Sequence, residues 1–411
     1  YYSDEINDAE DDDWMKFYTF ELNYVKDDIG RCYYRIAQCY SKIEDYQKAV
    51  EWYTKAAEQD NVDAQYLLGC CYYFGRGISK NYEKAVEWYT KAAEQNFVNA
   101  QYWLGNCYYF GKGVSQNYKT AVKWYTKAAE NYFTPAQNAL GNCYDSGRGV
   151  KQNYEKAAEW YTKAAEHGNE YAQNSLGDCY YLGRGVEQDY EKAVEWYTKA
   201  AEHGNEYAQN SLGDCYYLGR GVEQDYEKAI EWYTEAAEQD NVDAQYMLGV
   251  CYYLGEGVEK NYQEAVRLFT AASDEGHVDS LNLLGDCYYN GNGVAQNYSK
   301  AVSLYEKALS EGSSQAYYNL GSCYRWEFGV NKNKEKAKEL FKKGIELDNN
   351  SCKEAYEDML KNNDRIEKAK KIGGGILSVL GNIGSAYAQN YIQSALNDDY
   401  DDGDYYDEYD E

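Results

Sequence analysis

The twelve cysteines are the residues in this sequence with the greatest potential reactivity. Eight of them recur every 36 residues, at Cys71, Cys107, Cys143, Cys179, Cys215, Cys251, Cys287 and Cys323. Successive thiols then lie one repeat apart, roughly 9–10 Å if the repeats pack as helices, whereas a disulfide needs Cα atoms within about 7 Å. Zinc sites need Cys or His at short spacings, and the chain has 3 His. We therefore expect small buried apolar residues and no metal site. Thiol redox chemistry is the alternative, left open by the adjacent Cys70 and Cys71 and by Cys32, Cys39 and Cys352.

Two further patterns could suggest a cofactor or catalysis. Gly-x-Gly recurs from Gly75 and Gly77 onwards, but it lacks the third Gly of a dinucleotide site, the Lys-Ser/Thr of a P-loop and a preceding strand. The sequence contains no Ser-x-x-Lys, and neither His167 nor His203 has a nucleophile at a fixed spacing. We predict no cofactor and no catalytic residue, with a hydrolytic or thiol-based enzyme as a distant alternative.

These patterns belong to a repeat of two helices. Ala64, Leu68, Cys71 and Tyr72 have the spacing of the buried face of a first helix. Gly69 lies within that helix, where it costs about 1 kcal/mol relative to Ala, so its recurrence predicts that another helix approaches too closely for a Cβ. The same Leu-Gly pair returns at residues 104–105, 140–141, 176–177, 212–213, 248–249, 284–285 and 320–321.

Glycine ends the first helix and asparagine begins the second. Gly75 and Gly77 can adopt the left-handed cap conformation without strain. Asn81 is a good N-cap, replaced by Asp189 and Asp225 in later repeats. The pattern contains no strand signal, and the buried face of the second helix is predicted to be Tyr82, Ala85, Trp88, Tyr89, Ala92 and Ala93.

The repeat resembles a known family. Its pattern Ala-Gln-x-x-Leu-Gly-x-Cys-Tyr-Tyr-x-Gly-x-Gly-Val, followed by Tyr-x-Lys-Ala-x-x-Trp-Tyr-x-Lys-Ala-Ala-Glu, is similar to the Sel1-like repeat, a relative of the tetratricopeptide repeat. The resemblance implies an all-α, right-handed superhelical solenoid of antiparallel helix pairs, with the first helices lining a concave face. It also implies an adaptor or scaffold that assembles proteins. Some secreted relatives carry paired Cys within each repeat and this chain does not, which favours a reducing compartment and a cytoplasmic protein.

The repeat pattern and composition divide the chain into five segments. Residues 1–27 are an acidic segment that includes the start of the first helix, and residues 28–347 are the solenoid, with one tetratricopeptide-like unit and eight units of 36 residues. Residues 348–371 are predicted to form a capping helix. The Gly-rich apolar segment 372–396 is too polar for a membrane span, which leaves docking on the last repeat, self-association and membrane contact as alternatives. Residues 397–411 are an acidic tail, predicted to be disordered.

The positions that vary from repeat to repeat are expected to carry the function. Three of them, represented by Tyr66, Cys70 and Tyr73, lie on one side of the first helix and are not needed for packing in this interpretation. Asn can bond a peptide backbone, Tyr offers a rigid ring, and Asp favours a basic partner. The predicted groove residues are Tyr66, Tyr73, Tyr102, Asn106, Tyr109, Asn138, Asn142, Asn174, Asp178, Tyr181, Asn210, Asp214, Tyr217, Tyr246, Tyr253, Asn282, Asp286 and Tyr289. The alternative is a wettable surface that binds nothing specific.

Charge narrows the class of partner. The formal net charge is −28, which argues against nucleic acid and anionic membranes because both need a basic surface. The leading prediction is therefore a scaffold that binds a protein or peptide, with a basic one favoured. A secreted or translocated effector that engages host proteins is the runner-up.

Overall fold

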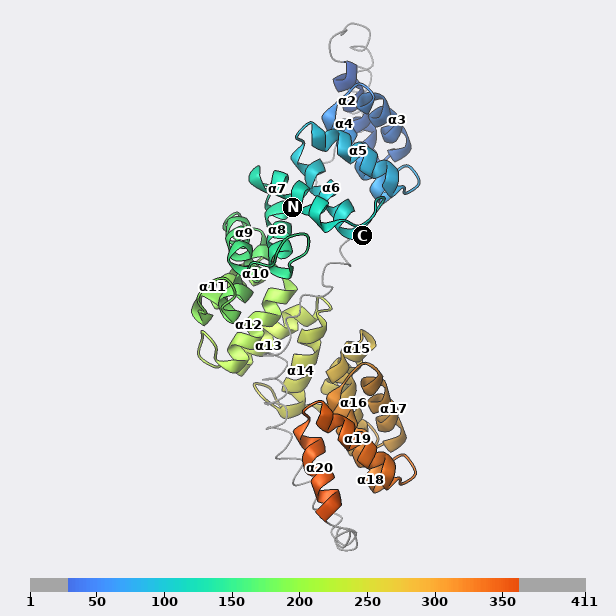
Figure 1. Ribbon diagram of the computed structural model, residues 1–411, viewed down its shortest axis with the longest axis vertical. Coiled ribbons are helices and arrows are strands. Elements are labelled where there is room, and N and C mark those ends of the chain that lie inside the picture. Colours follow the sequence, from blue (N-terminus) through green and yellow to red (C-terminus); the bar gives the residue numbers. More distant parts are fainter. Residues whose placement is uncertain (1–28, 362–411) are drawn as a thin grey trace. The chain divides into compact units, whose positions relative to one another are not determined.

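The computed structural model describes residues 29–361 and contains two compact bodies, which we call the N-terminal body (described residues 29–189) and the C-terminal body (190–361). The described residues form nineteen helices and no strand (Figure 1). The N-terminal body contains α2 (Ile29–Lys42), α3 (Tyr46–Ala57), α4 (Val62–Phe74), α5 (Tyr82–Glu94), α6 (Val98–Phe110), α7 (Tyr118–Glu130), α8 (Thr134–Ser146), α9 (Tyr154–Glu166) and α10 (Glu170–Leu182).

The C-terminal body continues the same alternation. Its helices are α11 (Tyr190–Glu202), α12 (Glu206–Leu218), α13 (Tyr226–Ala237), α14 (Val242–Leu254), α15 (Tyr262–Asp274), α16 (Val278–Asn290), α17 (Tyr298–Ser310), α18 (Ser314–Trp326), α19 (Lys334–Glu346) and α20 (Asn350–Lys361). Within each body every helix packs on the next one in the chain. The prediction of an all-α solenoid of helix pairs is confirmed.

The glycine inside the first helix is explained by an aromatic ring. A Cβ added to Gly69 would lie 2.6 Å from the ring of Tyr89 on α5, closer than any real Cβ contact. Tyr89 is fully buried, so its ring cannot move aside. The predicted close approach is therefore confirmed, and it joins the two helices of one repeat.

The two loop glycines have different roles. Gly75 has φ 76° and caps α4 by donating its N–H to the Cys71 carbonyl at 2.9 Å. Gly77 also has positive φ, but in addition a Cβ there would lie 2.1 Å from the backbone oxygen of Tyr46 in the preceding repeat. The Gly-x-Gly loop thus ends one helix and packs on the previous helix pair.

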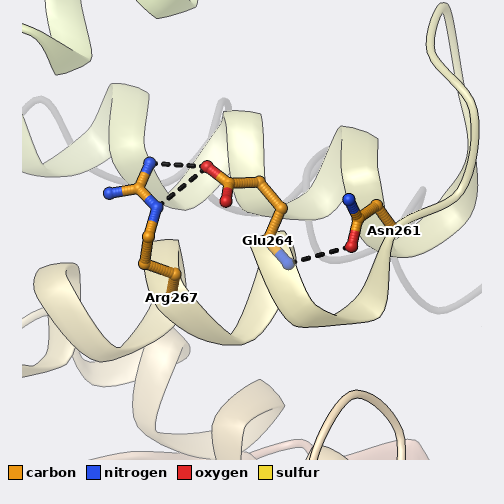
Figure 2. A network of polar contacts seen from close by, with 3 residues as sticks. All are labelled: Asn261, Glu264 and Arg267. Atoms are coloured by element: carbon orange, nitrogen blue, oxygen red, sulfur yellow. Dashed lines mark hydrogen bonds and ion pairs between the residues drawn. The ribbon is translucent and has the colours of Figure 1, made fainter.

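Side chains cap the second helices as predicted, and α15 shows the arrangement (Figure 2). The Asn261 Oδ1 accepts a hydrogen bond from the Glu264 backbone N–H at 3.1 Å. The Glu264 carboxylate in turn accepts from Arg267 at 2.9 and 2.6 Å. Asn81 caps α5 in the same way, at 2.9 Å from the Lys84 nitrogen.

The C-terminal end of the described chain is covered by α20. Cys352 is fully buried against α19, and Arg325 of α18 forms an ion pair with Asp358 at 2.5 Å. This helix occupies residues 350–361 of the predicted capping segment 348–371. Residues 362–371 and the predicted segments 1–27, 372–396 and 397–411 lie outside the described residues.

Candidate functional site

The predicted groove residues all lie on first helices, from α4 to α16, and none of them is fully exposed. Packing therefore uses more of these residues, which we call the variable stripe of the first helices, than the sequence suggested. The buried members are Tyr73, Asn106, Tyr109, Asn138, Tyr181, Asp214, Tyr217, Tyr246 and Asn282, and the half-buried members are Tyr66, Tyr102, Asn142, Asn174, Asp178, Asn210, Tyr253, Asp286 and Tyr289.

The second of the three variable positions, represented by Cys70, forms a hydrogen bond with the second helix of the same repeat. Asn106 accepts a hydrogen bond from the Tyr125 hydroxyl at 2.7 Å, and Asn142 accepts one from Tyr161 at the same distance. In the first full repeat the thiol of Cys70 takes this role. The expectation that packing leaves this position free is wrong, because the tyrosine hydroxyl would otherwise be buried without a partner.

In the C-terminal body the same bond is made by acids. Asp214 accepts from Tyr233, and Asp286 accepts from Tyr305, both at 2.6 Å. Burial raises the pKa of Asp214 to about 7, with a further contribution from Asp243, and burial raises the pKa of Asp286 to about 6. The arrangement thus holds carboxyl groups that titrate near neutral pH.

The third variable position, represented by Tyr73, contacts the following repeat. The ring of Tyr73 is 2% exposed, so it belongs to the core and is more deeply buried than the residue before it. Arg148, between the two loop glycines of the next repeat, donates a hydrogen bond to the Tyr109 hydroxyl at 2.8 Å. In the C-terminal body the Tyr217 hydroxyl donates to the Glu256 carboxylate. These tyrosines join neighbouring repeats, so the expectation that packing does not need this position is wrong.

The first variable position, represented by Tyr66, holds either an aromatic residue or an asparagine in the repeats described next. Aromatic residues pack on the residue before the next first helix: Tyr102 lies 5.4 Å from Phe133, and Tyr246 lies 4.5 Å from the ring of His277, which caps α16. Where the residue is Asn, the side-chain oxygen can be left without a partner. This is the case among the described residues for Asn138, Asn174 and Asn210.

These three asparagine oxygens differ in their position from the unpaired oxygens of Gln101 and Gln137. Gln101 and Gln137 also have an unpaired side-chain oxygen, but their amide groups donate to Ala93 and Ala129 between helices, so they lie inside the packing. The Asn side chains lie instead on the variable stripe of the first helices. A buried carbonyl oxygen without a hydrogen bond costs about 1–3 kcal/mol, so these three positions carry a cost that the packing of the chain does not offset.

The sequence held a signal for the tyrosine partners that was not used. Nineteen residues separate Asn106 from Tyr125, and the same interval joins Val250 to Phe269. The polar residue is thus lost in a repeat whose second helix lacks the hydroxyl. The correspondence is incomplete, because Ser322 is polar although its counterpart Phe341 has no hydroxyl, so the sequence indicates this pairing without determining it.

Burial raises the pKa of the Cys70 thiol and raises those of Cys71 and Cys352 to about 12, which acts against thiol reactivity at three of the five cysteines for which redox chemistry was left open. All twelve cysteines are free, and burial raises the pKa of Cys107 and Cys143 to about 12, so these thiols stay protonated near neutral pH. Residues 29–361 contain no group of three or more His, Cys, Asp or Glu able to hold a metal ion.

No described helix is both long enough and apolar enough to cross a bilayer.

Comparisons with known proteins agree with this geometry. The Sel1 repeat model matches residues 62–97, 98–132, 134–169, 170–205, 206–241, 242–277, 278–313 and 314–349, and the Tetratricopeptide repeat model matches residues 30–63. No curated protein matches the chain significantly.

Solved structures give the same result. The crystal structure of c5321, a protective antigen of uropathogenic Escherichia coli with an SLR fold, is 28% identical, covers 92% of this chain and 97% of its own, and has a TM-score of 0.52. A Sel1 repeat protein from Oxalobacter formigenes is 38% identical over 58% of this chain and 96% of its own, with a TM-score of 0.56.

Proposed function

Since the chain belongs to the Sel1 repeat family, whose solenoids are typical of protein–protein interaction scaffolds and generally non-catalytic, we propose that it is an adaptor that binds peptide segments of partner proteins along its first helices. The observation that carries this proposal is the set of orphan asparagine oxygens. Asn138 and Asn174 recur 36 residues apart on α8 and α10 of the N-terminal body. Asn210 has the same feature on α12 of the C-terminal body.

An extended peptide is the ligand that suits these oxygens. Its backbone N–H groups are donors whatever its sequence, and each could satisfy one asparagine oxygen. Selection among peptides would then depend on the residues that differ between repeats.

We further propose that the chain has no catalytic activity of its own and works in a reducing compartment such as the cytoplasm. Nine of the twelve free thiols are buried, which argues against thiol-based catalysis because the thiolate is the reactive form. The lack of paired cysteines within each repeat favours a reducing compartment. Blocking accessible thiols with iodoacetamide should leave binding unchanged. Loss of binding after alkylation would contradict the assignment of the cysteines to packing.

The test uses short random peptides displayed on phage and selected on the purified protein. The substitutions Asn138→Ala and Asn174→Ala, both in the N-terminal body, should together reduce the affinity of selected peptides by at least about fivefold, because each removes a hydrogen bond between neutral groups that is worth about 0.5–1.5 kcal/mol. The matched control is Asn131→Ala, since Asn131 is exposed and bonds only the Lys127 carbonyl of its own helix. Equal affinities of the double variant and the wild-type protein would refute the proposal.

A further inference from the structure

The loops between the two helices of a repeat are basic in the first three full repeats of the N-terminal body. These loops are residues 75–81, 111–117 and 147–153. Together they contain five Lys and Arg and no Asp or Glu. The turns that join one repeat to the next are residues 58–61, 94–97, 130–133 and 166–169, and they contain five Asp and Glu and no Lys or Arg. Residues 29–189 contain 18 residues of each sign, so the charges are balanced but separated, and the loops form a basic edge.

The loops of this basic edge follow one another at a regular step. Each loop packs on the first residue of the second helix in the preceding repeat. A Cβ added to Gly113 would lie 2.3 Å from the carbonyl oxygen of Tyr82, and one added to Gly149 would lie 2.4 Å from that of Tyr118. Successive loops are therefore one repeat apart, about 9–10 Å at the usual distance between packed helices.

A cation occupies the same place in each loop. The residue between the two loop glycines is basic in four successive repeats, and we call these residues the loop-cation ladder: Arg76, Lys112, Arg148 and Arg184. The Lys112 Nζ lies 5.6 Å from the ring centroid of Tyr73 in the preceding repeat. The Arg148 guanidinium lies 5.9 Å from the ring centroid of Tyr109, the equivalent tyrosine one repeat later. Because equivalent rings hold both cations, their spacing follows that of the repeats.

The ladder can be reached from outside and has a second lysine beside it. Arg76 is exposed, and the other three members are half-buried. The Nζ atoms of Lys80 and Lys112 lie 5.7 and 5.9 Å from the centroid of one ring, that of Tyr82, so the two nitrogens are no more than about 12 Å apart. Cations at this separation repel one another, and an anionic ligand between them would be attracted by both.

Packing does not require a cation at the ladder position. In the last three repeats of the C-terminal body this position is occupied by Glu256, Asn292 and Phe328. Glu256 accepts a hydrogen bond from the Tyr217 hydroxyl, and Asn292 donates one to the Tyr253 hydroxyl at 3.2 Å. An acid or an amide therefore makes the contact to the preceding repeat that Arg148 makes with Tyr109. The run of cations in the N-terminal body needs another explanation.

The chain contains an acidic segment whose interval matches the ladder. Residues 397–411 carry nine acids and no base, and aspartate recurs at every third residue: Asp398, Asp401, Asp404, Asp407 and Asp410. Three residues of an extended or polyproline II chain advance about 9–10 Å, which is the step of the ladder. Residues 1–13 carry seven acids, but their longest series at this interval has three members, Glu5, Asp8 and Asp11. The better match is therefore residues 397–411.

We propose that residues 397–411 bind in an extended conformation along the loop-cation ladder of the same chain, with one aspartate of the three-residue series at each loop. Arginine and lysine form charge-assisted hydrogen bonds with carboxylates. Each exposed ion pair is weak by itself, but several in one segment add together. The 35 residues 362–396 form the connection and can span up to about 120 Å when extended. A flexible connection makes the local concentration of the segment high. The contact concerns the loops and is independent of the asparagine oxygens in the proposed function.

The test is zero-length cross-linking of the full chain with a carbodiimide, which joins a lysine to a carboxylate only where they touch. Mass spectrometry should locate links between Lys112 and the acids of residues 397–411 in monomeric product, with a yield that decreases as salt is added. Absence of these links would overturn the proposal. So would links that occur only in dimers, which would assign the segment to a second copy, or links from Lys112 to residues 1–13 instead.

Two substitutions in the ladder test its contribution while Lys112 remains as the reporter. Arg76→Gln with Arg148→Gln should lower the yield at Lys112 at least about threefold, measured at the salt concentration that halves the wild-type yield. The matched control is Lys91→Gln with Lys163→Gln. These lysines are exposed and also lie over aromatic rings, but they are near the C-terminal ends of α5 and α9. The control should change the yield less than about 1.5-fold, and equal losses in the two variants would overturn the proposal.

A variant of the segment tests the interval without altering the solenoid. Residues 397–411 are replaced by a permutation of the same composition in which acids no longer recur at every third residue. The yield at Lys112 should decrease at least about threefold, because fewer carboxylates can then coincide with the loops. An unchanged yield would mean that net charge alone attracts the segment, and it would overturn the proposed alignment with the ladder.

Discussion

Asp214→Asn should make the protein more stable at alkaline pH, because the wild-type protein buries an ionised acid there. Asp214 is 5% exposed and accepts one hydrogen bond, from Tyr233 at 2.6 Å. Burial, with help from Asp243, raises its pKa to about 7, from an ordinary value near 3.9. Asn142 shows that an amide accepts the same tyrosine bond, so the substitution should preserve the contact.

The direction of the pH dependence follows from the raised pKa. A group that holds its proton more tightly in the folded chain adds stability that is complete below about pH 4 and is lost as the pH rises through about 7. One pKa unit is worth about 1.4 kcal/mol, which sets an upper bound of about 4 kcal/mol for the whole loss, with about 2 kcal/mol of it between about pH 5.5 and about pH 8.5. Because water and relaxation screen real buried charges, we expect about half of that difference.

The assay is urea unfolding followed by tryptophan fluorescence at these two pH values, both above the sequence pI of about 4.5. Asp214→Asn should exceed the wild-type protein in unfolding free energy at about pH 8.5 by more than it does at about pH 5.5. The reverse substitution in the N-terminal body, Asn106→Asp, should lower stability at the higher pH. A variant that is less stable than the wild-type protein at both pH values, or a difference that does not change with pH, would refute the reasoning.

Three further predictions concern single contacts, each measured by thermal or urea unfolding. Gly141→Ala should destabilise the protein by about 1–3 kcal/mol, since the new Cβ would lie 2.5 Å from the buried Tyr161 ring. The loss of stability should vanish in a Tyr161→Leu background, and an unchanged loss there would contradict this explanation. Tyr132→Asn should stabilise the protein by about 0.5–1 kcal/mol, because Tyr132 is 78% exposed with φ 60° and Asn tolerates that backbone conformation better. A lower melting temperature of the variant would contradict this prediction. Asn117→Ala should cost about 1 kcal/mol through loss of the cap on the Thr120 N–H, and Asn117→Asp should restore most of it unless the cap is unimportant.

Much of the fold could be predicted from the sequence because its determinants are local. A helix ends at Gly75 because the left-handed conformation is needed there, and begins after Asn81 because the side chain accepts an N-terminal N–H. Gly69 also predicted a close contact between helices, because a glycine destabilises the interior of a helix and is expected there only where a neighbour leaves no space for a Cβ.

The candidate site could be predicted only in part, because burial depends on which helices meet. Tyr72 and Tyr73 are adjacent in sequence and of the same type, and only packing decides that the second is buried. Asn142 and Asn138 lie on the same stripe, yet the first bonds a tyrosine hydroxyl and the oxygen of the second has no partner. These differences arise across helices and between repeats, beyond the range of any local pattern.

The sequence by itself therefore determined the repeat, its helices, their caps and the glycine contacts, since each depends on residues within one turn or one fixed interval. Only the tertiary structure decided which polar side chains of the stripe are used by packing and which remain available. The physical reason is that a hydrogen bond such as that between Asp286 and Tyr305 joins two helices, and its cost or benefit depends on how deeply both are buried.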